Sequence, residues 1–375
     1  MRRLSFENPQ IMDILNHQVI HMDQGITYTP EYLVTRQMRY YPSRTAQIIR
    51  SVYLGELQAS PYGADMVYGS ILSGQGERWQ NFGEDPNSYI LTVMLGRELF
   101  CQKGQRVEET EALKERIAAH AGYIEKTDAL TAEWQLEIPV DEQSRIGLLL
   151  DEASYAYARS SREKVGSFLR SKGIVVRECK PVFTGFDYLA AGLIDQAIDQ
   201  AKRLIAGWEA AGIHKVITLC GQSQYLFTQL LPYLEIETEI EFISILDLAE
   251  EMVAEQAYIY GGSYFTRYLR KEKQLNSLLQ NTTEEAILSA PEFLPELQGD
   301  KRRNVVGIWT PPLAAEYHAA GLPEGMEDKI YEQSLATIQN AAFKKLIVCD
   351  PFAWKKLQDK GYPASKMVYF LDILR

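Results

Sequence analysis

The chain has 375 residues, 46% of them hydrophobic and 24% charged, so it carries enough apolar side chains for more than one folded domain. Its 39 Lys and Arg residues against 50 Asp and Glu residues give a net charge of −11. This balance excludes nucleic acid and anionic lipid as the main partner, because both require a basic surface. No run approaches the roughly 20 apolar residues of a membrane helix. The first residues also lack an apolar leader core, so we expect a cytoplasmic protein that is not integral to a membrane.

The first part of the chain, residues 1–130, is predicted to be mostly helical. Residues 43–58 place apolar side chains at helical spacing and predict a helix. The glycine-rich residues 59–84 predict an ordered loop. The Asp-Pro pair at 85–86 suits the start of another helix, and residues 107–126 predict a charged amphipathic helix.

From residue 143 onward, short apolar runs alternate with helical stretches, which is typical of βαβ units and a parallel sheet. The run at 145–150 is continuously apolar and ends in two acidic residues, as a buried parallel strand does. The expected strands are 145–150, 174–176, 216–219 and 242–245, and the expected helices are 160–172, 186–212 and 224–231.

The end of the chain repeats these landmarks in the same order. The matched pairs are 145–149 with 304–308, 215–220 with 344–349, and 242–248 with 367–373. A repeat of this length indicates a duplicated domain. The predicted fold class is therefore α/β, with Rossmann-like repeats built on parallel sheets at 143–252 and 301–375 and a mostly helical domain before them. A helical connector is expected at 253–300, and its basic run at 267–273 is predicted to be a solvated helix face.

The cysteines are few and far apart. There are four, Cys101, Cys179, Cys220 and Cys349, and no two lie within 40 residues of each other. No close pair exists to start a zinc or iron–sulfur site, and we expect buried free thiols that pack as small apolar residues.

The duplicated pattern resembles the cysteine-rich CCG domains of the B subunit of heterodisulfide reductase and of related subunits of glycolate and lactate oxidases and succinate dehydrogenases. In the first repeat, Phe183-Thr184-Gly185 stands where the family has Cys-Cys-Gly. Cys220-Gly221-Gln222-Ser223 stands where it has Cys-Pro-x-Cys. In the second repeat, residues 309–312 (Trp-Thr-Pro-Pro) resemble the family's His-x-Pro-Cys, and Cys349-Asp350-Pro351-Phe352 resembles its Cys-Pro-x-Cys.

A weaker resemblance covers the helical region, which would then be a degenerate ferredoxin-like domain. Residues 41–55 are similar to the helix between the two cluster-binding cysteine runs of the ferredoxin-like C subunit of the same enzymes. The cysteines on either side of that helix are absent from this chain.

The departures from the family pattern concern the cluster ligands. The degenerate cluster positions are Phe183, Thr184, Gly185, Cys220, Ser223, Pro312, Cys349 and Phe352, so each repeat keeps one thiol. An iron–sulfur cluster needs about four thiolates. The resemblance therefore implies a retained fold without cluster, metal or other cofactor. It implies a non-catalytic subunit that docks with cluster-bearing heterodisulfide-reductase-like subunits, with a flavoprotein as a further expected partner, in a larger electron-transfer complex.

An alternative interpretation uses the polar residues that follow the strands. Ligands bind at the carboxyl ends of strands in open α/β sheets. A stand-alone enzyme or small-molecule-binding protein could therefore use a crevice lined by Asp151, Glu152, Ser223, Thr310 and Asp350. The simpler interpretation, which we favour for the acids, is that they cap the following helices.

Overall fold

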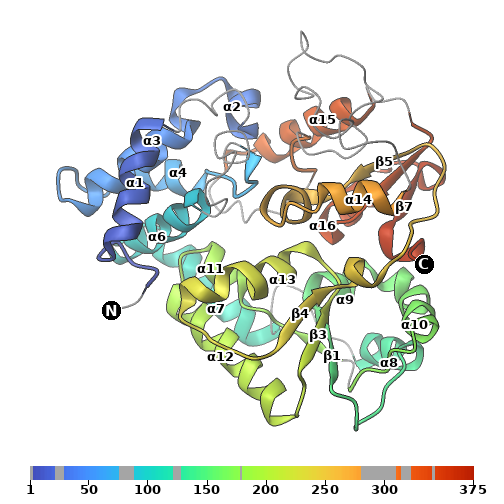
Figure 1. Ribbon diagram of the computed structural model, residues 1–375. Coiled ribbons are helices and arrows are strands. Elements are labelled where there is room, and N and C mark those ends of the chain that lie inside the picture. Colours follow the sequence, from blue (N-terminus) through green and yellow to red (C-terminus); the bar gives the residue numbers. More distant parts are fainter. Residues whose placement is uncertain are drawn as a thin grey trace.

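The computed structural model describes residues 3–21, 29–75, 88–120, 128–177, 180–279, 310–313, 322–339 and 343–375. A group of helices, coloured blue in Figure 1, lies beside two lobes that each contain a parallel sheet. The expected α/β class with parallel sheets is confirmed. Within the described residues, every helix is too short or too polar to cross a membrane.

The N-terminal part is helical in all the residues described before the first strand, apart from its connections. The helices are α1 (Pro9–His21), α2 (Pro30–Thr35), η2 (Met38–Tyr40), α3 (Pro42–Tyr53), α4 (Pro61–Tyr68), α6 (Ser88–Gln102), α7 (Val107–His120) and α8 (Asp128–Glu137). Helix α4 lies inside the segment predicted as a loop, so that prediction is wrong for these residues. The Ser60 hydroxyl accepts a hydrogen bond from the Gly63 amide at 3.2 Å, and Pro61 occupies a first-turn position, which together start the helix. The Asp-Pro pair at 85–86 lies outside the described residues.

The first sheet has four parallel strands in the order β2-β1-β3-β4. Their bounds are β1 (Ile146–Asp151), β2 (Pro181–Val182), β3 (Lys215–Thr218) and β4 (Glu241–Ser244). The strand expected at 174–176 is wrong, because Val176 pairs with the loop before β1 instead. Its amide donates to the Pro139 carbonyl at 2.9 Å, and its carbonyl accepts from the Asp141 amide at 2.8 Å.

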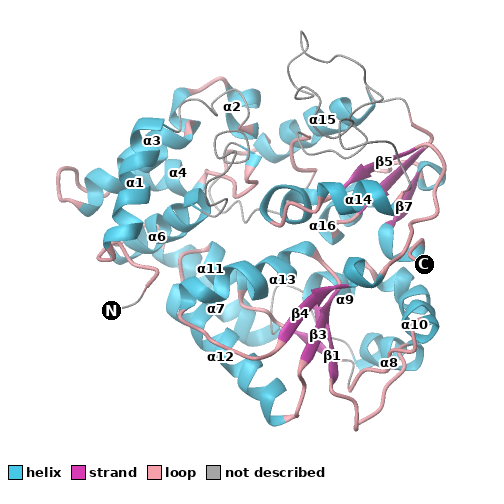
Figure 2. Ribbon diagram, in the orientation of Figure 1, coloured by secondary structure: helices cyan, strands magenta, loops and turns pink. Residues whose placement is uncertain are grey.

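Helices cover both faces of this sheet (Figure 2). Leu149 and Val216 point into a core shared with α12 (Ile194–Ala210) and the N-terminal helices. Leu148 and Ile217 point to the opposite face, against α8 and α10 (Arg162–Ser171). Burial on both faces explains why β1 is a continuous apolar run.

The long helix expected at 186–212 is broken into two. The first piece is α11 (Phe186–Ala190), and α12 follows after Gly192. Gly192 has φ +82°, and a Cβ there would lie 2.4 Å from the Glu98 amide nitrogen. The close approach of α6 therefore requires glycine and ends the first helix.

The second sheet has three parallel strands in the order β5-β6-β7, which are Ala257–Tyr260, Lys345–Val348 and Met367–Tyr369. This order matches β1-β3-β4 of the first sheet. Strand β5 lies inside the predicted connector 253–300, so the helical prediction is wrong for these four residues. They pair residue by residue with β6 and complete the sheet. The strand expected at 304–308 lies outside the described residues.

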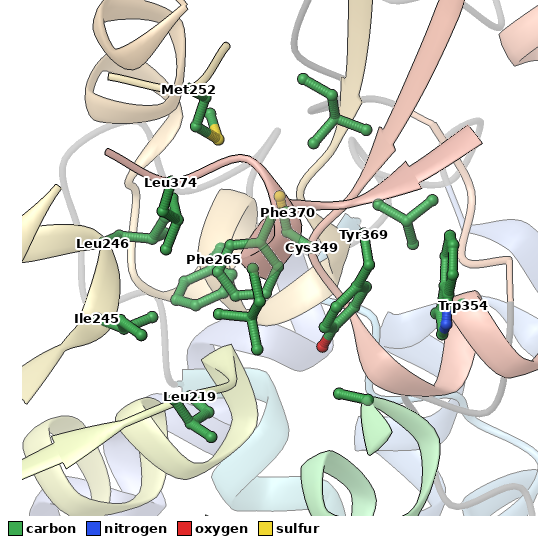
Figure 3. Close-up of a cluster of buried hydrophobic side chains, with 14 of the residues drawn as sticks. Leu219, Ile245, Leu246, Met252, Phe265, Cys349, Trp354, Tyr369, Phe370 and Leu374 are labelled. Atoms are coloured by element: carbon green, nitrogen blue, oxygen red, sulfur yellow. The ribbon is translucent and has the colours of Figure 1, made fainter. Parts of the chain in front are cut away.

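The remaining elements close the two lobes. They are α9 (Glu152–Tyr157), η3 (Arg159–Ser161), α13 (Gly221–Tyr225), η4 (Leu226–Leu230), η5 (Leu231–Leu234), η6 (Ile245–Leu248), η7 (Tyr264–Tyr268), α14 (Glu272–Leu278), α15 (Met326–Gln339), α16 (Pro351–Asp359), η11 (Ala364–Lys366) and η12 (Phe370–Asp372). Figure 3 shows one shared core, in which Leu219, Ile245 and Leu246 of the first lobe lie with residues of the second lobe. The second lobe contributes Phe265, Cys349, Tyr369 and Phe370.

Two buried arginines join the helical region to the lobes. Arg97 of α6 donates to the carbonyls of Val67, Tyr68, Ser70 and Ala190, the last of which belongs to α11. Arg267 of η7 donates to the Ser73 carbonyl at 2.5 Å and to the Thr310 carbonyl at 3.2 Å. The solvated helix face predicted at 267–273 is therefore wrong for Arg267, which is 1% exposed.

Candidate functional site

The carboxyl ends of the two sheets face each other. Asp151 ends β1 and precedes α9, while Asp350 follows β6 and precedes α16. These two helices pack together, with the Tyr157 and Phe352 rings 5.9 Å apart. The end of β1 therefore lies across the lobe interface from the end of β6.

The ends of β3 and β5 also lie across the lobe interface from each other. Helix α13 follows β3, and η7 follows β5. Tyr225 and Tyr264 lie 5.7 Å apart between ring centres, and a Cβ at Gly221 would lie 3.0 Å from the Phe265 amide nitrogen. Because β5-β6 corresponds to β1-β3, the lobes meet with an approximate two-fold relation at their strand ends.

The positions of the first repeat that resemble a cluster site are 183–185, 220 and 223, and they lie near the end of β1 in the structure. The Asp151 carboxyl lies close to the Cys220 thiol, and Glu152 accepts a hydrogen bond from the Thr184 amide. The thiol also lies 3.3 Å from the Ser223 hydroxyl oxygen, to which it donates. Phe183 packs edge-on against Tyr188, with ring centres 5.3 Å apart. Packed side chains therefore fill this first set of positions, and each of the two sets is called a corner below.

The second set of positions is filled in a similar way. Cys349 is fully buried directly after β6, and Phe352 packs against Tyr157. The Pro312 carbonyl accepts a hydrogen bond from the Ser334 hydroxyl at 3.0 Å. In the described part of the chain, no three His, Cys, Asp or Glu side chains are arranged to hold a metal ion.

These residues do not fit an iron–sulfur cluster. Burial, followed by the nearby Asp151 carboxyl, raises the pKa of Cys220 well above its ordinary value. Burial, followed by Asp350, raises the pKa of Cys349 as well. Cluster iron binds thiolates, whereas both buried groups are held as neutral thiols and each corner supplies one.

Both thiols should therefore resist alkylation in the folded protein. We expect iodoacetamide at pH 8 to leave Cys220 and Cys349 unmodified under native conditions and to modify both in urea, because only the exposed thiolate reacts. Peptide mass spectrometry measures each site, and the half-buried Cys101 provides the internal comparison. Rapid native labelling of Cys220 or Cys349 would contradict the buried assignment.

Four of the five residues of the alternative site also lie at this interface. Asp151, Glu152, Ser223 and Asp350 are 3%, 7%, 2% and 5% exposed, so they are buried where an open crevice was expected. Thr310 is positioned separately, with its hydroxyl 2.5 Å from that of Tyr258 on β5. The expected helix caps are confirmed, because Asp151 accepts from the Ser154 amide at 2.9 Å and Asp350 from the Ala353 amide at 2.8 Å.

Two further residues that the sequence did not single out belong to this group. Asp187 of α11 lies close enough to Glu152 to raise its pKa, and Tyr369 of β7 lies near both Asp350 and Asp151. Asp187 directly follows the Phe-Thr-Gly-Phe corner, which was the available sequence signal. Asp151, Glu152, Asp187 and Asp350 are called the strand-end acids below.

Burial controls the ionisation of Asp151, Glu152 and Asp350. Burial raises the pKa of Asp350 to about 7, and it also raises the pKa of Asp151. Burial, followed by the charges of Asp187 and Asp151, raises the pKa of Glu152 well above its ordinary value. No Lys or Arg is among the groups that set these three pKa values in the described structure. Carboxyls brought together without a counter-charge retain protons.

The site also contains polar atoms that lack hydrogen-bond partners. The Tyr369 hydroxyl and the Glu152 Oε2 atom are both buried and unpaired. Tyr369 is fully buried, and in Figure 3 its hydroxyl oxygen points away from the labelled apolar side chains of its own lobe. A buried polar group without a hydrogen-bond partner costs about 1–3 kcal/mol.

Comparison with known proteins adds no family assignment: no family model matches the chain, and no curated protein or solved structure is significantly similar to it.

Proposed function

We propose that this chain is a cluster-free, heterodisulfide-reductase-like subunit with a structural and docking role in a larger iron–sulfur and flavin electron-transfer complex of the cytoplasm. The observation that carries the proposal is the chemistry of the two corners that resemble cluster sites. Each supplies one buried, protonated thiol, and packed Phe, Thr, Ser and Pro residues occupy the other matched positions. On this proposal the lobes are degenerate CCG-type repeats that have kept their fold and lost electron transfer.

The parallel sheets support this proposal by their order. Strands β3-β4 and β6-β7 correspond to two of the matched sequence pairs, and each pair is adjacent and parallel. The strand beside β6 is β5 (Ala257–Tyr260), which the sequence repeat did not include. In both lobes a cysteine follows the middle strand, Cys220 after β3 and Cys349 after β6. A duplication that retains these positions while losing their neighbours is consistent with a scaffold derived from a cluster-binding protein.

The helical region offers a surface for docking. Among the large hydrophobic side chains that are exposed in the described residues, Met38, Leu54, Leu57 and Tyr62 are 59%, 45%, 51% and 58% exposed. In sequence, all four lie within residues 38–62, on either side of α3, the helix that resembles part of the ferredoxin-like subunit. On this proposal these exposed apolar side chains contribute to the docking surface.

Purification tests this function in two steps. The isolated chain should be colourless and contain no stoichiometric iron, whereas the chain purified gently from its source should bring iron–sulfur proteins with it. Substituting Leu57→Glu and Tyr62→Glu should reduce that association at least tenfold, and Leu136→Glu should not, although Leu136 is 83% exposed on α8. Iron bound stoichiometrically to the isolated chain would refute the proposal, as would a native preparation free of iron–sulfur partners.

A second candidate function is favoured by the buried acids. We propose that the strand-end acids form a small-molecule-binding site, supported by the unpaired atoms of Glu152 and Tyr369 at the same interface. The carboxyl ends of parallel strands are the usual ligand-binding edge of such sheets. Native mass spectrometry of protein purified from its source should then show a bound small molecule. A spectrum that shows the mass of the unliganded chain and no other species would refute this function.

A further inference from the structure

The second lobe contains a cavity of about 600 Å³ that shares no lining residue with the strand-end acids. Its walls come from the second half of α15, from residues 343–344 just before β6, and from residues 360–366 between α16 and β7. The cavity therefore lies where the strands begin, at the opposite end of the sheet from Asp350, which follows β6. Its volume is within the range of about 300–1,000 Å³ that is typical of small-molecule sites.

The wall formed by residues 360–366 is anchored at both ends. Helix α16 is closed by Gly361, whose φ of +71° lets the Tyr362 amide donate to the Leu357 carbonyl at 2.9 Å. The Lys345 ammonium group, on β6, donates to the Ser365 carbonyl at 2.9 Å. The shape of this wall is therefore set by the fold.

Three aromatic rings line the cavity, those of Tyr331, Phe343 and Tyr362. Leu335 and Gln339 follow Tyr331 at intervals of four residues, so these three side chains share one face of α15. Burial raises the pKa of both tyrosines, so their phenols are neutral at pH 8 and add no negative charge. Aromatic faces of this kind are platforms on which a planar ring can stack.

Three lysines line the same cavity, and the lining contains no acid among the residues that the structure describes. Lys360 is paired with Asp328 at 2.8 Å. Lys344 and Lys366 are exposed, and within the described ranges neither lies at ion-pair distance from an acidic side chain. Two uncompensated ammonium groups at one cavity are a local positive region in a chain whose net charge is −11.

An aromatic phosphate monoester matches both features of the lining. A phosphate monoester carries a charge of about −2 at pH 8, which two ammonium groups can balance. Lysine is a common phosphate ligand because its ammonium group acts as a point charge. A planar ring on the same molecule would supply the partner for the aromatic side chains.

We propose that this cavity binds a nucleoside monophosphate. The base lies against the rings of Tyr331, Phe343 and Tyr362. The phosphate lies between the ammonium groups of Lys344 and Lys366. This inference goes beyond both proposed functions and depends on neither, because the cavity contains none of the residues on which they rest.

The probe is AMP, tested on the full purified chain by isothermal titration calorimetry at pH 8. We expect saturable binding of one AMP per chain. Adenosine supplies the ring without the charge, and inorganic phosphate supplies the charge without the ring. Each should bind about tenfold more weakly or less, because each loses the contacts of one half of the ligand. Added salt should weaken the binding of AMP more than that of adenosine.

Matched variants locate the site. Lys344→Gln and Lys366→Gln should each weaken AMP binding about tenfold and leave adenosine binding unchanged. Tyr362→Leu should weaken the binding of both ligands. Lys329→Gln removes the same charge from an exposed position of α15 outside the cavity and should change neither. Asp350→Asn should also leave AMP binding unchanged, which distinguishes this cavity from the strand-end acids. Because both cavity lysines are exposed, their variants should unfold at the same temperature as the original chain.

Each outcome decides for or against the proposal. Saturable AMP binding that both cavity-lysine variants weaken, and that Lys329→Gln does not, supports it. Absence of saturable binding or equal binding by all variants overturns it. Inorganic phosphate or adenosine that binds as tightly as AMP also overturns it, since the cavity would then recognise only one half of the ligand. None of these results bears on the two proposed functions, which are tested by bound iron and by a ligand at the strand ends.

Discussion

Replacing Asp350 by Asn is expected to stabilise the protein at pH 8 and to have little effect at pH 4. Burial raises the pKa of Asp350 to about 7 in the folded state, against an ordinary value of 3.8. The folded carboxyl therefore binds its proton more tightly than the unfolded one, so the free energy of unfolding decreases as pH rises from about 4 to about 7 and is level above that. A difference of about three pKa units corresponds to about 4 kcal/mol, which is the upper limit of the gain for Asn at pH 8.

The substitution isolates the charge because asparagine keeps the other role of the residue. Asp350 Oδ1 caps α16 by accepting from the Ala353 amide, and an amide oxygen can do the same. Urea unfolding at pH 4 and pH 8 measures the effect, and Asp199→Asn on the exposed face of α12 provides the control. A loss of stability at pH 8 would show that the Asp350 carboxylate is ionised and paired in the native state.

Replacing Arg97 by Met is expected to destabilise the protein by about 3–5 kcal/mol, the cost of removing one partner from a buried charged network. The guanidinium donates to four backbone carbonyls, including those of Ser70 at 2.8 Å and Tyr68 at 3.2 Å. Methionine fills a similar volume without any donor, so these carbonyls lose a buried partner, at about 1–3 kcal/mol for each group left unsatisfied. Burial lowers the pKa of Arg97 only to about 10, so the charge is present at neutral pH.

The loss of local stability in the Arg97→Met variant should be greatest where Arg97 joins the helical region to the first lobe. Because one of the carbonyls belongs to Ala190 of α11, amide hydrogen exchange in α11 and in residues 67–75 should accelerate in the variant. Arg116→Met, at an exposed position of α7, is the control and should change the urea midpoint little. A similarly small change for Arg97→Met would show that water or another side chain satisfies the four carbonyls.

The two effects have opposite signs and a common physical basis. The buried Asp350 carboxyl has no positively charged group among the causes of its raised pKa, so replacing it with a neutral amide should stabilise the folded state at high pH. Arg97 is a buried charge whose donors are paired with carbonyl oxygens, so removing it should leave those acceptors without a partner. The first effect therefore comes from burial of a carboxyl and the second from loss of the donors to buried carbonyl oxygens.

The sequence predicted the local features of the candidate site well, because local chemistry decides them. Asp151 and Asp350 follow continuous apolar strands and cap the next helices, as their short polar side chains favour. The isolated positions of Cys220 and Cys349 indicated buried thiols, and both are buried after a middle strand.

Sequence pattern alone was sufficient to predict the positions of β1, β3, β4, β6 and β7, and most clearly that of β1, whose continuous apolar run is buried on both faces of its sheet. The strand Ala257–Tyr260 depends on tertiary contact, because these four apolar residues become β5 by pairing with β6, which lies far along the chain. Tertiary contact also placed Arg267 among distant carbonyls and Tyr369 beside Asp350. Which buried groups meet is fixed by the packing of two lobes, and no local pattern of residues contains that information.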